Sequence, residues 1–262
     1  MVPGAKIAVK NLATNVVTTV ETNDRGFYTV PPVNPGEYSV TVSATGFKTT
    51  VQKSVELRVA DRMGLDLKLE LGGTAETVLV LSEAPLLETQ SSSQGTVISK
   101  ELVQALPTRG RNVFDFAQLT AGVTGRVQST FGLRPFDNGE NSVRINGGQG
   151  NTNEVLLDGA PNTQRESTSP ANVSIVPPPE AVDEVKIQTN LYDAEYGRTG
   201  GGVISVNLRS GTNNYHGAAW WYVRNDILNA NTFESNAAGG QKTSYRLHEP
   251  GVHFSGPVRI PG

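Results

Sequence analysis

The residues best suited to metal or acid–base chemistry in this sequence are its three histidines, His216, His248 and His253. The stretch "HEPGVH" holds two of them, and a zinc-binding helix would need them at positions i and i+4 on one face. Here they are five residues apart, and Pro250 and Gly251 between them disfavour a helix. The spacing therefore argues against a metal site.

Two further stretches have the composition of ion-binding loops without the required spacing. "NGGQGNTN" at 146–153 is rich in glycine, but no Lys-Ser or Lys-Thr follows it, so it is a poor phosphate loop. "DNGEN" at 137–141 offers oxygen ligands without the spacing of a calcium loop. No nucleophile with a base partner stands out either. The sequence therefore predicts no catalytic residue and no metal or cofactor site, and indicates that the protein is not an enzyme.

Composition excludes several other classes of protein. The 262 residues are 37% hydrophobic and 18% charged, enough for one or two domains with their own cores. A net charge of -3 provides no basic field for nucleic acid, and the lack of cysteine excludes disulfides and thiolate metal sites. No apolar run approaches the ~18 residues of a membrane helix. The N-terminus lacks a secretory signal pattern, so either the protein is cytosolic or its natural sequence starts further upstream.

Residues 1–71 contain short strand-like runs at close spacing, separated by turn-rich segments. The runs are "AKIAV", "VVTTV", "FYTV", "YSVTVSA", "TVQKSVEL" and "LDLKLEL", and the turns include "NDRG", "PPVNPGE" and "ATGF". Tyr38, Val40 and Val42 alternate with polar residues, as do the leucines between 65 and 71. This pattern predicts a small antiparallel β-sandwich.

These runs resemble the carboxypeptidase regulatory-like domain, a non-catalytic sandwich of the transthyretin or prealbumin type that is also grouped with carbohydrate-binding-like folds. The resemblance rests on "VPGAKIAVKN" and "TNDRGFYTVPPVNPGEYSVTVSATGFKT". The family has one more strand before "VPGA", so we expect the first strand of this domain, and a signal peptide, to lie upstream of the sequence.

Three glycines at 200–202 precede an alternating run in which Ile204, Val206 and Leu208 face one side and Ser205 and Asn207 the other. Glycine tolerates positive φ and has no Cβ, so the triplet permits a sharp bend or a close approach of two backbones. The sequence therefore predicts a glycine hinge that leads into a strand with one buried face.

From residue 97 the pattern changes to mixed α and β. Ser99 is placed to cap a short helix through "KELVQAL", and "NVFDFAQLTAG" puts Val113, Phe116 and Ala117 on one helical face and ends at Gly122. We expect strands at "SVRIN", "VLL" and "VKIQT", a helix at "PEAVDEV" and polar loops at 124–141, 147–153 and 161–174.

Residues 97–211 resemble the plug domain of TonB-dependent outer-membrane receptors. The matching motifs, in the family's order, are "LVQALPTRGRNVFDFAQLTAGV", "VRINGG", "NEVLLDGAPN", "PPEAVDEVKIQT" and "AEYGRTGGGVISVNLRSGTN". The resemblance is closest to Oar-like receptors, which carry the same N-terminal sandwich. It implies a structural plug motif that consists of Asp158, Gly159, Tyr196, Gly197, Gly201 and Gly202.

A linker at 72–96 contains the run "ETVLV", which has two readings. It is either the last strand of the sandwich or an exposed segment that adds to another protein's sheet by backbone hydrogen bonds. The resemblance implies the second, a TonB box that pairs with the periplasmic protein TonB and its inner-membrane energising complex. The candidate residues are Glu76, Thr77, Val78, Leu79 and Val80.

The same resemblance implies that the three polar loops present residues to a ligand. An exposed arginine, aromatic or amide side chain can anchor a bound molecule. The candidates are Arg134, Phe136, Gln149, Asn151 and Arg165. The ligand is unknown, although receptors with an N-terminal sandwich tend to take large nutrients such as glycans or peptides.

Residues 212–262 resemble the first two strands of an outer-membrane β-barrel, at "YHGAAWWYVRND" and "RLHEPGVHFSGPVRIPG". A plugged transporter needs about 22 strands, so we expect the chain to be the N-terminal piece of one, with its barrel in outer-membrane lipid. The expected fold is α+β and mostly β: sandwich, plug and first barrel strands. The alternative is a non-transporting surface protein with a carbohydrate-binding or adhesin-like sandwich.

Overall fold

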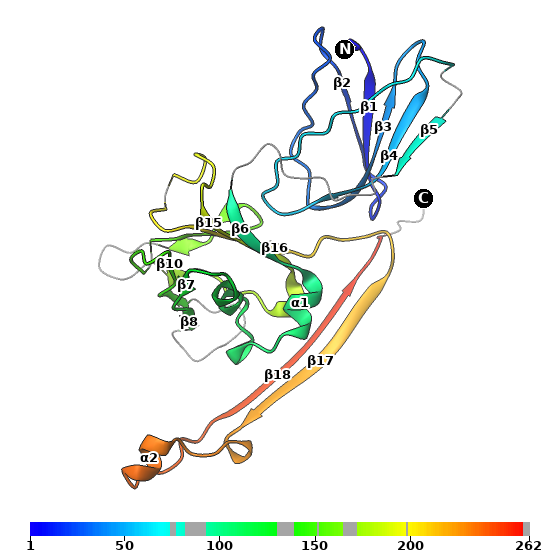
Figure 1. Ribbon diagram of the computed structural model, residues 1–262. Coiled ribbons are helices and arrows are strands. Elements are labelled where there is room, and N and C mark those ends of the chain that lie inside the picture. The colour runs from blue at the N-terminus through cyan, green and yellow to red at the C-terminus, as the bar shows by residue number, and fades with distance from the viewer. Residues whose placement is uncertain are drawn as a thin grey trace. The chain divides into compact units, whose positions relative to one another are not determined.

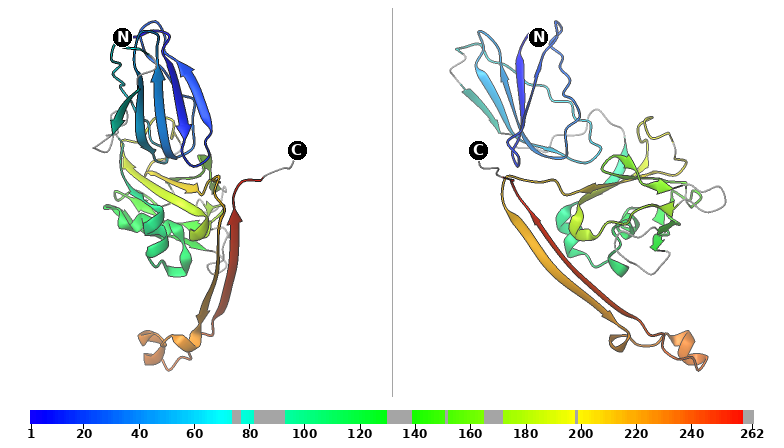
Figure 2. Two further views of the ribbon diagram at one scale, coloured as in Figure 1. Left: turned by 90° about the vertical axis from the view of Figure 1, so that its right-hand side faces the viewer. Right: turned by 180° about the vertical axis from the view of Figure 1, so that it is seen from behind.

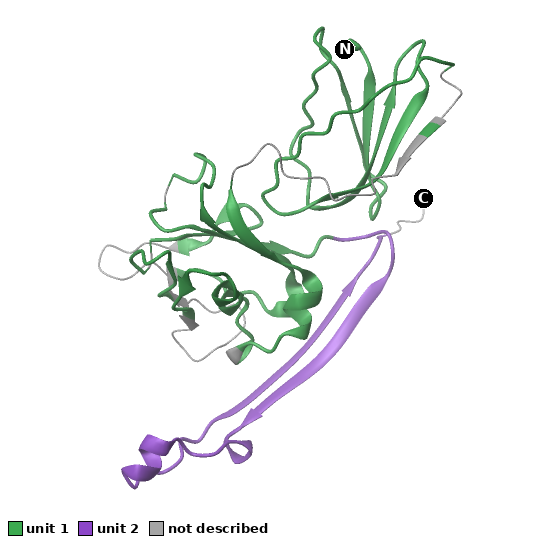
Figure 3. Ribbon diagram, viewed as in Figure 1, with its two compact units in different colours: residues 1–210 green, residues 211–262 purple. Residues whose placement is uncertain are grey.

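The computed structural model describes residues 1–73, 77–81, 93–129, 139–150, 152–164, 172–197 and 199–258. The chain divides into two compact units, Met1–Ser210 and Gly211–Gly262 (Figure 3). The first unit contains a β domain, residues 1–81, and a mixed domain, residues 93–210, both visible in Figure 1. Within these ranges no helix has the length and apolar character of a membrane span.

The β domain is built on one five-stranded sheet of order β2-β1-β3-β4-β5 (Figures 1 and 2). Its strands are β1 Lys6–Asn11, β2 Val17–Glu21, β3 Gly36–Ser43, β4 Thr49–Leu57 and β5 Thr77–Leu81. The predicted alternation is present, because Tyr38, Val40 and Val42 are buried with Ile7 against the domain core. The four strands within residues 1–71 pair antiparallel, as predicted, and β5, which lies beyond residue 71, adds to β4 in parallel.

Two predicted strands of the β domain, "FYTV" and "LDLKLEL", are not strands in the structure. Their alternation nevertheless has its expected effect, since Leu65, Leu67 and Leu69 pack against the core of the sheet. These segments bond to their neighbours only at separate points, including the Tyr28 hydroxyl, which donates to the Leu65 carbonyl at 2.8 Å. The apolar pattern therefore sets burial without forming a second regular sheet.

The mixed domain is organised by a second five-stranded sheet, of order β12-β11-β16-β15-β6. Its strands are β6 Gln94–Ile98, β11 Glu154–Leu157, β12 Ala160–Pro161, β15 Val182–Asn190 and β16 Val203–Leu208. β16 lies at the centre, parallel to β11 and antiparallel to β15. Because Ser205 is only 3% exposed, both faces of β16 are covered at its middle, and the prediction of a strand with one buried face was wrong there.

Short helices cover the core face of this sheet. They are α1 Lys100–Ala105, η1 Arg109–Arg111, η2 Val113–Leu119 and η3 Pro179–Ala181. Val113, Phe116 and Ala117 are buried as predicted, and the helix is capped by Asn112, whose side chain accepts the Phe114 N–H. Ser99 precedes α1 but makes no side-chain cap, because its hydroxyl donates to Glu101 instead.

The predicted helix at "PEAVDEV" is a single turn, since β15 already begins at Val182. Val182 and Val185 are fully buried, and β15 gains a neighbouring strand on each side. Sheet pairing of β-branched residues thus overrides the helical pattern of this segment.

The polar loops of the mixed domain contain short strands that the sequence did not predict. β8 Val127–Ser129, β9 Gly139–Asn141, β13 Thr163–Gln164 and β14 Asn172–Val173 form a sheet of order β13-β14-β9-β8. β7 Val123–Thr124 and β10 Arg144–Ile145 pair separately. The pairing of β9 with β14 joins the loop at 124–141 to the loop at 161–174.

The second unit is a long two-stranded ribbon, coloured purple in Figure 3. β17 His216–Asn225 pairs with β18 Arg246–Ser255 in continuous antiparallel register. A connection with the one-turn helix η4 Asp226–Leu228 and the short helix α2 Phe233–Ala237 joins the strands. Both predicted strands are therefore present, and the register places Trp220 and Trp221 on opposite faces, as expected from their alternation.

Candidate functional site

The candidate coupling segment forms the edge strand β5 of the β domain. Thr77 lies opposite Thr49 and Leu81 opposite Lys53 in a parallel pairing with β4. This placement matches the first of the two sequence readings, a strand of the sandwich. Glu76 lies outside the described residues. β5 is the last strand of its sheet, so one of its edges is bonded to β4 and the other ends the sheet.

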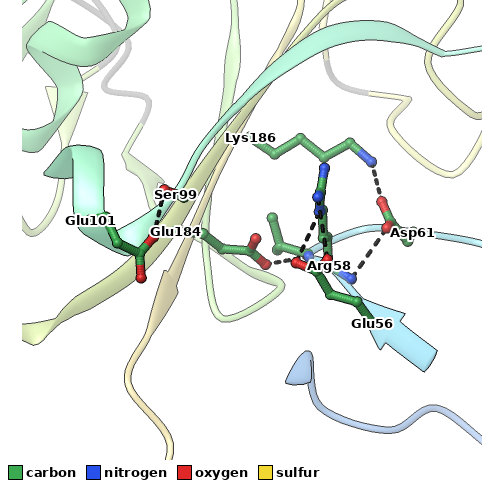
Figure 4. Close-up of polar contacts among 8 residues, drawn as sticks. Glu56, Arg58, Asp61, Ser99, Glu101, Glu184 and Lys186 are labelled. Atoms are coloured by element: carbon green, nitrogen blue, oxygen red, sulfur yellow. Dashed lines mark hydrogen bonds and ion pairs between the residues drawn. The ribbon is translucent and has the colours of Figure 1, made fainter. Parts of the chain in front are cut away.

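A turn at 58–62, here named the docking turn, connects the β domain to the mixed domain through an ion pair. The Lys186 ammonium lies 2.7 Å from Asp61 Oδ1 and also donates to the Ala60 carbonyl at 3.3 Å. The two charged side chains are only 5% and 7% exposed, and Figure 4 shows them pointing toward one another. This is a buried, hydrogen-bonded pair of the kind whose separation leaves an uncompensated charge.

The docking turn is itself shaped by Asp61. The second carboxylate oxygen of Asp61 accepts the Arg58 N–H at 3.2 Å, and the Asp61 N–H donates to the Arg58 carbonyl at 3.2 Å. Ala60, between them, has a φ of 53°, in the left-handed region. One carboxylate therefore closes the turn and binds the lysine of the neighbouring domain.

Glu184, two residues before Lys186 on the same face of β15, provides a second polar contact to the turn. Its carboxylate accepts the backbone N–H of Val59, which is 6% exposed. Burial raises the pKa of the Glu184 carboxyl to about 7. The neighbouring carboxylates of Asp183 and Asp61 act in the same direction, whereas the Val59 N–H opposes the rise.

More exposed ion pairs surround these contacts. Arg62 pairs with Asp193 at 3.3 Å and with Glu195 at 2.8 Å, in the segment that leads to the glycine triplet. These side chains are about one third to one half exposed, so each pair contributes little to stability. The buried Lys186–Asp61 pair and the Glu184 contact are therefore the main polar attachments of the turn.

The contact at Glu184 should weaken as pH rises. The pKa of Glu184 lies above its ordinary value of 4.5, so the joined state binds the proton more tightly than the separated state. Its contribution is complete below about pH 4.5 and is lost as pH rises through about 7. Hydrogen exchange at the Val59 amide, corrected for intrinsic rates, should show more protection at about pH 5 than at about pH 8.

Glu184→Gln is the matched control for this titration, because the amide oxygen still accepts the Val59 N–H but cannot ionise. The pH dependence of protection should disappear in this variant. An unchanged dependence in Glu184→Gln would show that another group is responsible.

The predicted turn at Asp158 and Gly159 joins β11 to β12. The two residues have φ values of 49° and 77°, as a two-residue type I′ hairpin turn requires. Asp158 Oδ1 also accepts the backbone N–H of Leu208 at 2.8 Å, at the end of β16. The aspartate thus fixes the turn and the end of the neighbouring strand.

The sequence predicts either a sharp bend or a close approach of two backbones at the glycine triplet, and the structure shows the close approach. None of the three glycines has a positive φ. A Cβ on Gly202 would lie 2.6 Å from the Gln188 carbonyl oxygen, and one on Gly201 would lie 2.2 Å from Asn153 Oδ1. The missing side chains therefore let the chain enter β16 tightly against β15 and the start of β11.

The other residues of this motif have different environments. At Gly197 a Cβ would meet no atom within 4 Å, so space does not require glycine there. Tyr196 is partly buried, which raises the pKa of its hydroxyl to about 12, and the Glu195 carboxylate adds to this rise. Tyr196 is thus a neutral side chain at physiological pH.

Of the ligand-facing candidates, only Gln149 lies among the described residues, where its side chain is exposed. Its carbonyl accepts the Thr152 hydroxyl at 2.8 Å, which closes the glycine-rich loop. Arg134, Phe136, Asn151 and Arg165 lie outside the described residues. The strands that flank two of the three loops are brought together by the β9–β14 pairing.

The sequence pattern did not predict two buried asparagines whose side chains bond to backbone groups, as a neighbouring strand would. The buried Asn162, within "NEVLLDGAPN", donates to the Ile175 carbonyl at 2.8 Å and accepts the Ile175 N–H at 3.0 Å. Asn153, fully buried, donates to the Val143 carbonyl at 2.7 Å. Their occurrence in the motifs was a signal, but polar residues in a loop-like stretch do not reveal their partners.

Three family models match consecutive parts of the chain. The carboxypeptidase regulatory-like domain matches residues 1–70, the TonB-dependent receptor plug domain residues 88–203, and an outer membrane beta barrel domain residues 207–260. The TonB-dependent transporter Oar of Myxococcus xanthus is 25% identical over 264 residues, which are 98% of this chain and 24% of Oar.

Solved structures of outer-membrane receptors resemble about two thirds of this chain. The siderophore receptor PirA from Acinetobacter baumannii has a TM-score of 0.44 at 22% identity, over 64% of this chain and 23% of PirA. A mutant ferric enterobactin receptor from Pseudomonas aeruginosa has a TM-score of 0.45 at 17% identity, over 65% of this chain and 23% of the receptor. The chain thus spans about a quarter of the length of these relatives. In this chain a carboxypeptidase regulatory-like domain, a TonB-dependent receptor plug domain and an outer membrane beta barrel domain therefore follow one another, and the chain is similar along nearly its whole length to a TonB-dependent transporter.

Proposed function

We propose that this chain is the N-terminal part of a TonB-dependent transporter, in which the plug domain gates energised uptake of a scarce or large nutrient. The observation that carries the proposal is the order of the three domain matches, together with a relative that aligns over 98% of the chain and is itself a TonB-dependent transporter. The ligand is a glycan, a peptide or a chelate, in keeping with the tendency of receptors that carry an N-terminal sandwich.

In this proposal β5 is the coupling strand that TonB binds. Strand addition draws its affinity from main-chain hydrogen bonds and requires an extended segment with an available edge. β5 supplies both, because it is extended and is the terminal strand of its sheet. TonB would then add a sixth strand beyond β5 while β4 holds the other edge.

The ligand would approach the plug loops that contain Arg134, Phe136, Gln149, Asn151 and Arg165. The exposed position of Gln149 and the pairing of β9 with β14 support a common ligand-facing surface. No observation favours the alternative of a non-transporting adhesin or glycan-binding protein. The relatives are transporters and receptors, and we propose no catalytic step.

Photo-cross-linking in cells tests the proposed partner without knowledge of the ligand. A benzoylphenylalanine in place of Val78, in β5, should form an adduct with TonB that an antibody against TonB detects. The matched control is the same substitution at Thr18, in β2, the terminal strand at the opposite edge of the sheet. No adduct from position 78 in correctly assembled receptor, or equal adducts from both positions, would contradict the proposal.

A further inference from the structure

The β17–β18 ribbon has two faces of different chemistry. Directly opposed residues of an antiparallel pair share a face, and successive residues alternate between faces. Ala219 lies opposite Val252, and Trp221 opposite Pro250. The residues here named the apolar face are Tyr215, Ala219, Trp221, Val223, Val252 and Phe254.

The apolar face is also the more exposed one. Trp221 is 70% exposed, Val252 77% and Phe254 75%, although each is a large apolar side chain. Tyr215 stacks on Phe254 with ring centroids 5.8 Å apart, at the end of the ribbon away from the connection. An exposed and continuous apolar surface of this kind marks a site of interaction with a protein or a membrane.

The opposite face carries polar and titratable groups. His216 contacts the Ser255 hydroxyl at 2.7 Å, and His253 lies beside the Trp220 ring at 5.9 Å. Arg224 lies over the ring of Tyr245 at 5.0 Å. Trp220 itself lies flat over Gly251, where a Cβ would come within 2.3 Å of its ring. Its apolar surface is thus used within the ribbon.

The apolar face spans most of the height of a lipid-facing band, which is about 25 Å in outer-membrane barrels. Eight residue steps from Tyr215 to Val223 correspond to about 26 Å along the strand, or about 20 Å in height at the ~40° tilt of barrel strands. His248 lies opposite Val223, with its ring 5.9 Å from that of Trp221, and Arg246 and Asn225 follow on the same face at the end near the connection. The aromatic pair at one end and the polar residues at the other delimit an apolar band, as at membrane interfaces.

We propose that the apolar face contacts the acyl chains of the outer membrane, and that the face with His216, Trp220, Arg224, Glu249 and His253 borders the aqueous barrel interior. This assignment rests on the proposed function and adds to it the side of the strand that meets lipid. Lipid is favoured over a protein partner because the outer membrane beta barrel model covers residues 207–260. The band between Tyr215 and Val223 also carries no charged residue on this face.

Site-specific fluorescence tests the assignment on the full-length receptor. Residues 1–262 contain no cysteine, so single cysteines are introduced here after any cysteine in the remainder of the receptor has been replaced by serine. Trp221→Cys and Val252→Cys report the apolar face, and their sequence neighbours Trp220→Cys and His253→Cys are the matched controls on the other face. Each is labelled with the fluorophore NBD, and the receptor is reconstituted in vesicles of dioleoylphosphatidylcholine or of its brominated form.

Brominated lipid should remove most of the NBD emission at positions 221 and 252 and leave positions 220 and 253 nearly unchanged. Aqueous iodide should quench 220 and 253 more strongly. The reverse pattern, or equal quenching on both faces, would overturn the face assignment and leave the proposed function standing. Quenching by iodide alone at all four positions would overturn both, because the ribbon would then lie outside the membrane.

Discussion

Lys186→Met should open the contact between the docking turn and the plug sheet. The substitution leaves Asp61 buried without its ammonium partner, and breaking a buried pair from one side costs about 3–5 kcal/mol. The Val59 amide, which donates to Glu184 in the same contact, reports this opening by hydrogen exchange. We expect its exchange rate to rise by roughly a hundredfold to a few thousandfold.

A matched control comes from a second lysine–aspartate pair that is exposed. Lys100 lies 3.8 Å from Asp183, with both side chains nearly half exposed, so Lys100→Met should change stability by less than about 1 kcal/mol. Lys186→Met combined with Asp61→Asn should recover much of the loss, because the asparagine oxygen still accepts the Arg58 N–H and the pair no longer leaves an uncompensated charge. If Lys186→Met and Lys100→Met changed the exchange rate of the Val59 amide equally, the buried pair would not be what holds the docking turn against the mixed domain.

Proline in β5 should weaken binding of TonB. Proline has no N–H and is poorly tolerated in a paired strand. The N–H groups of Val78 and Leu79 point to opposite edges of β5, as successive residues of a strand do. Val78→Pro and Leu79→Pro therefore remove one donor from the free edge and one from the β4 edge. We expect the free-edge variant to lose affinity roughly tenfold or more.

Leu79→Ala is the control for this pair, since it shortens the side chain and keeps the backbone donor. The variant whose proline lies at the β4 edge should instead lower the melting temperature of the β domain, because it removes a bond within the sheet. The two prolines thus distinguish the free edge of β5, which TonB is proposed to bind, from the edge that pairs with β4.

The sequence predicted those elements whose cause is local. Alternation at Tyr38, Val40 and Val42 predicted a buried sheet face, and the Asp158-Gly159 pair predicted a turn, because both depend on nearby residues alone. The helix at "PEAVDEV" was wrong because pairing with β6 and β16, remote in sequence, decides the conformation of that segment. The helical pattern of the segment itself contains no information about these two pairing partners.

The contact between the docking turn and the mixed domain could not be predicted from the sequence for the same reason. Lys186 lies in an alternating run where a lysine is ordinarily solvated, and its partner Asp61 is 125 residues away. Glu184 looked like part of a helix and is in fact a strand residue that contacts the docking turn. Only the fold brings these charges together. The fold was also needed to place "ETVLV", whose residues 77–80 belong to a strand at the edge of the sheet.

Titration of residues 1–262 with the purified periplasmic domain of TonB is the most direct test that β5 is the coupling strand. The account predicts saturable binding to the natural sequence, equal binding to Leu79→Ala, and roughly tenfold or greater weakening by one of the two prolines. Equal affinity for all four proteins, or no binding to the natural sequence, would contradict it.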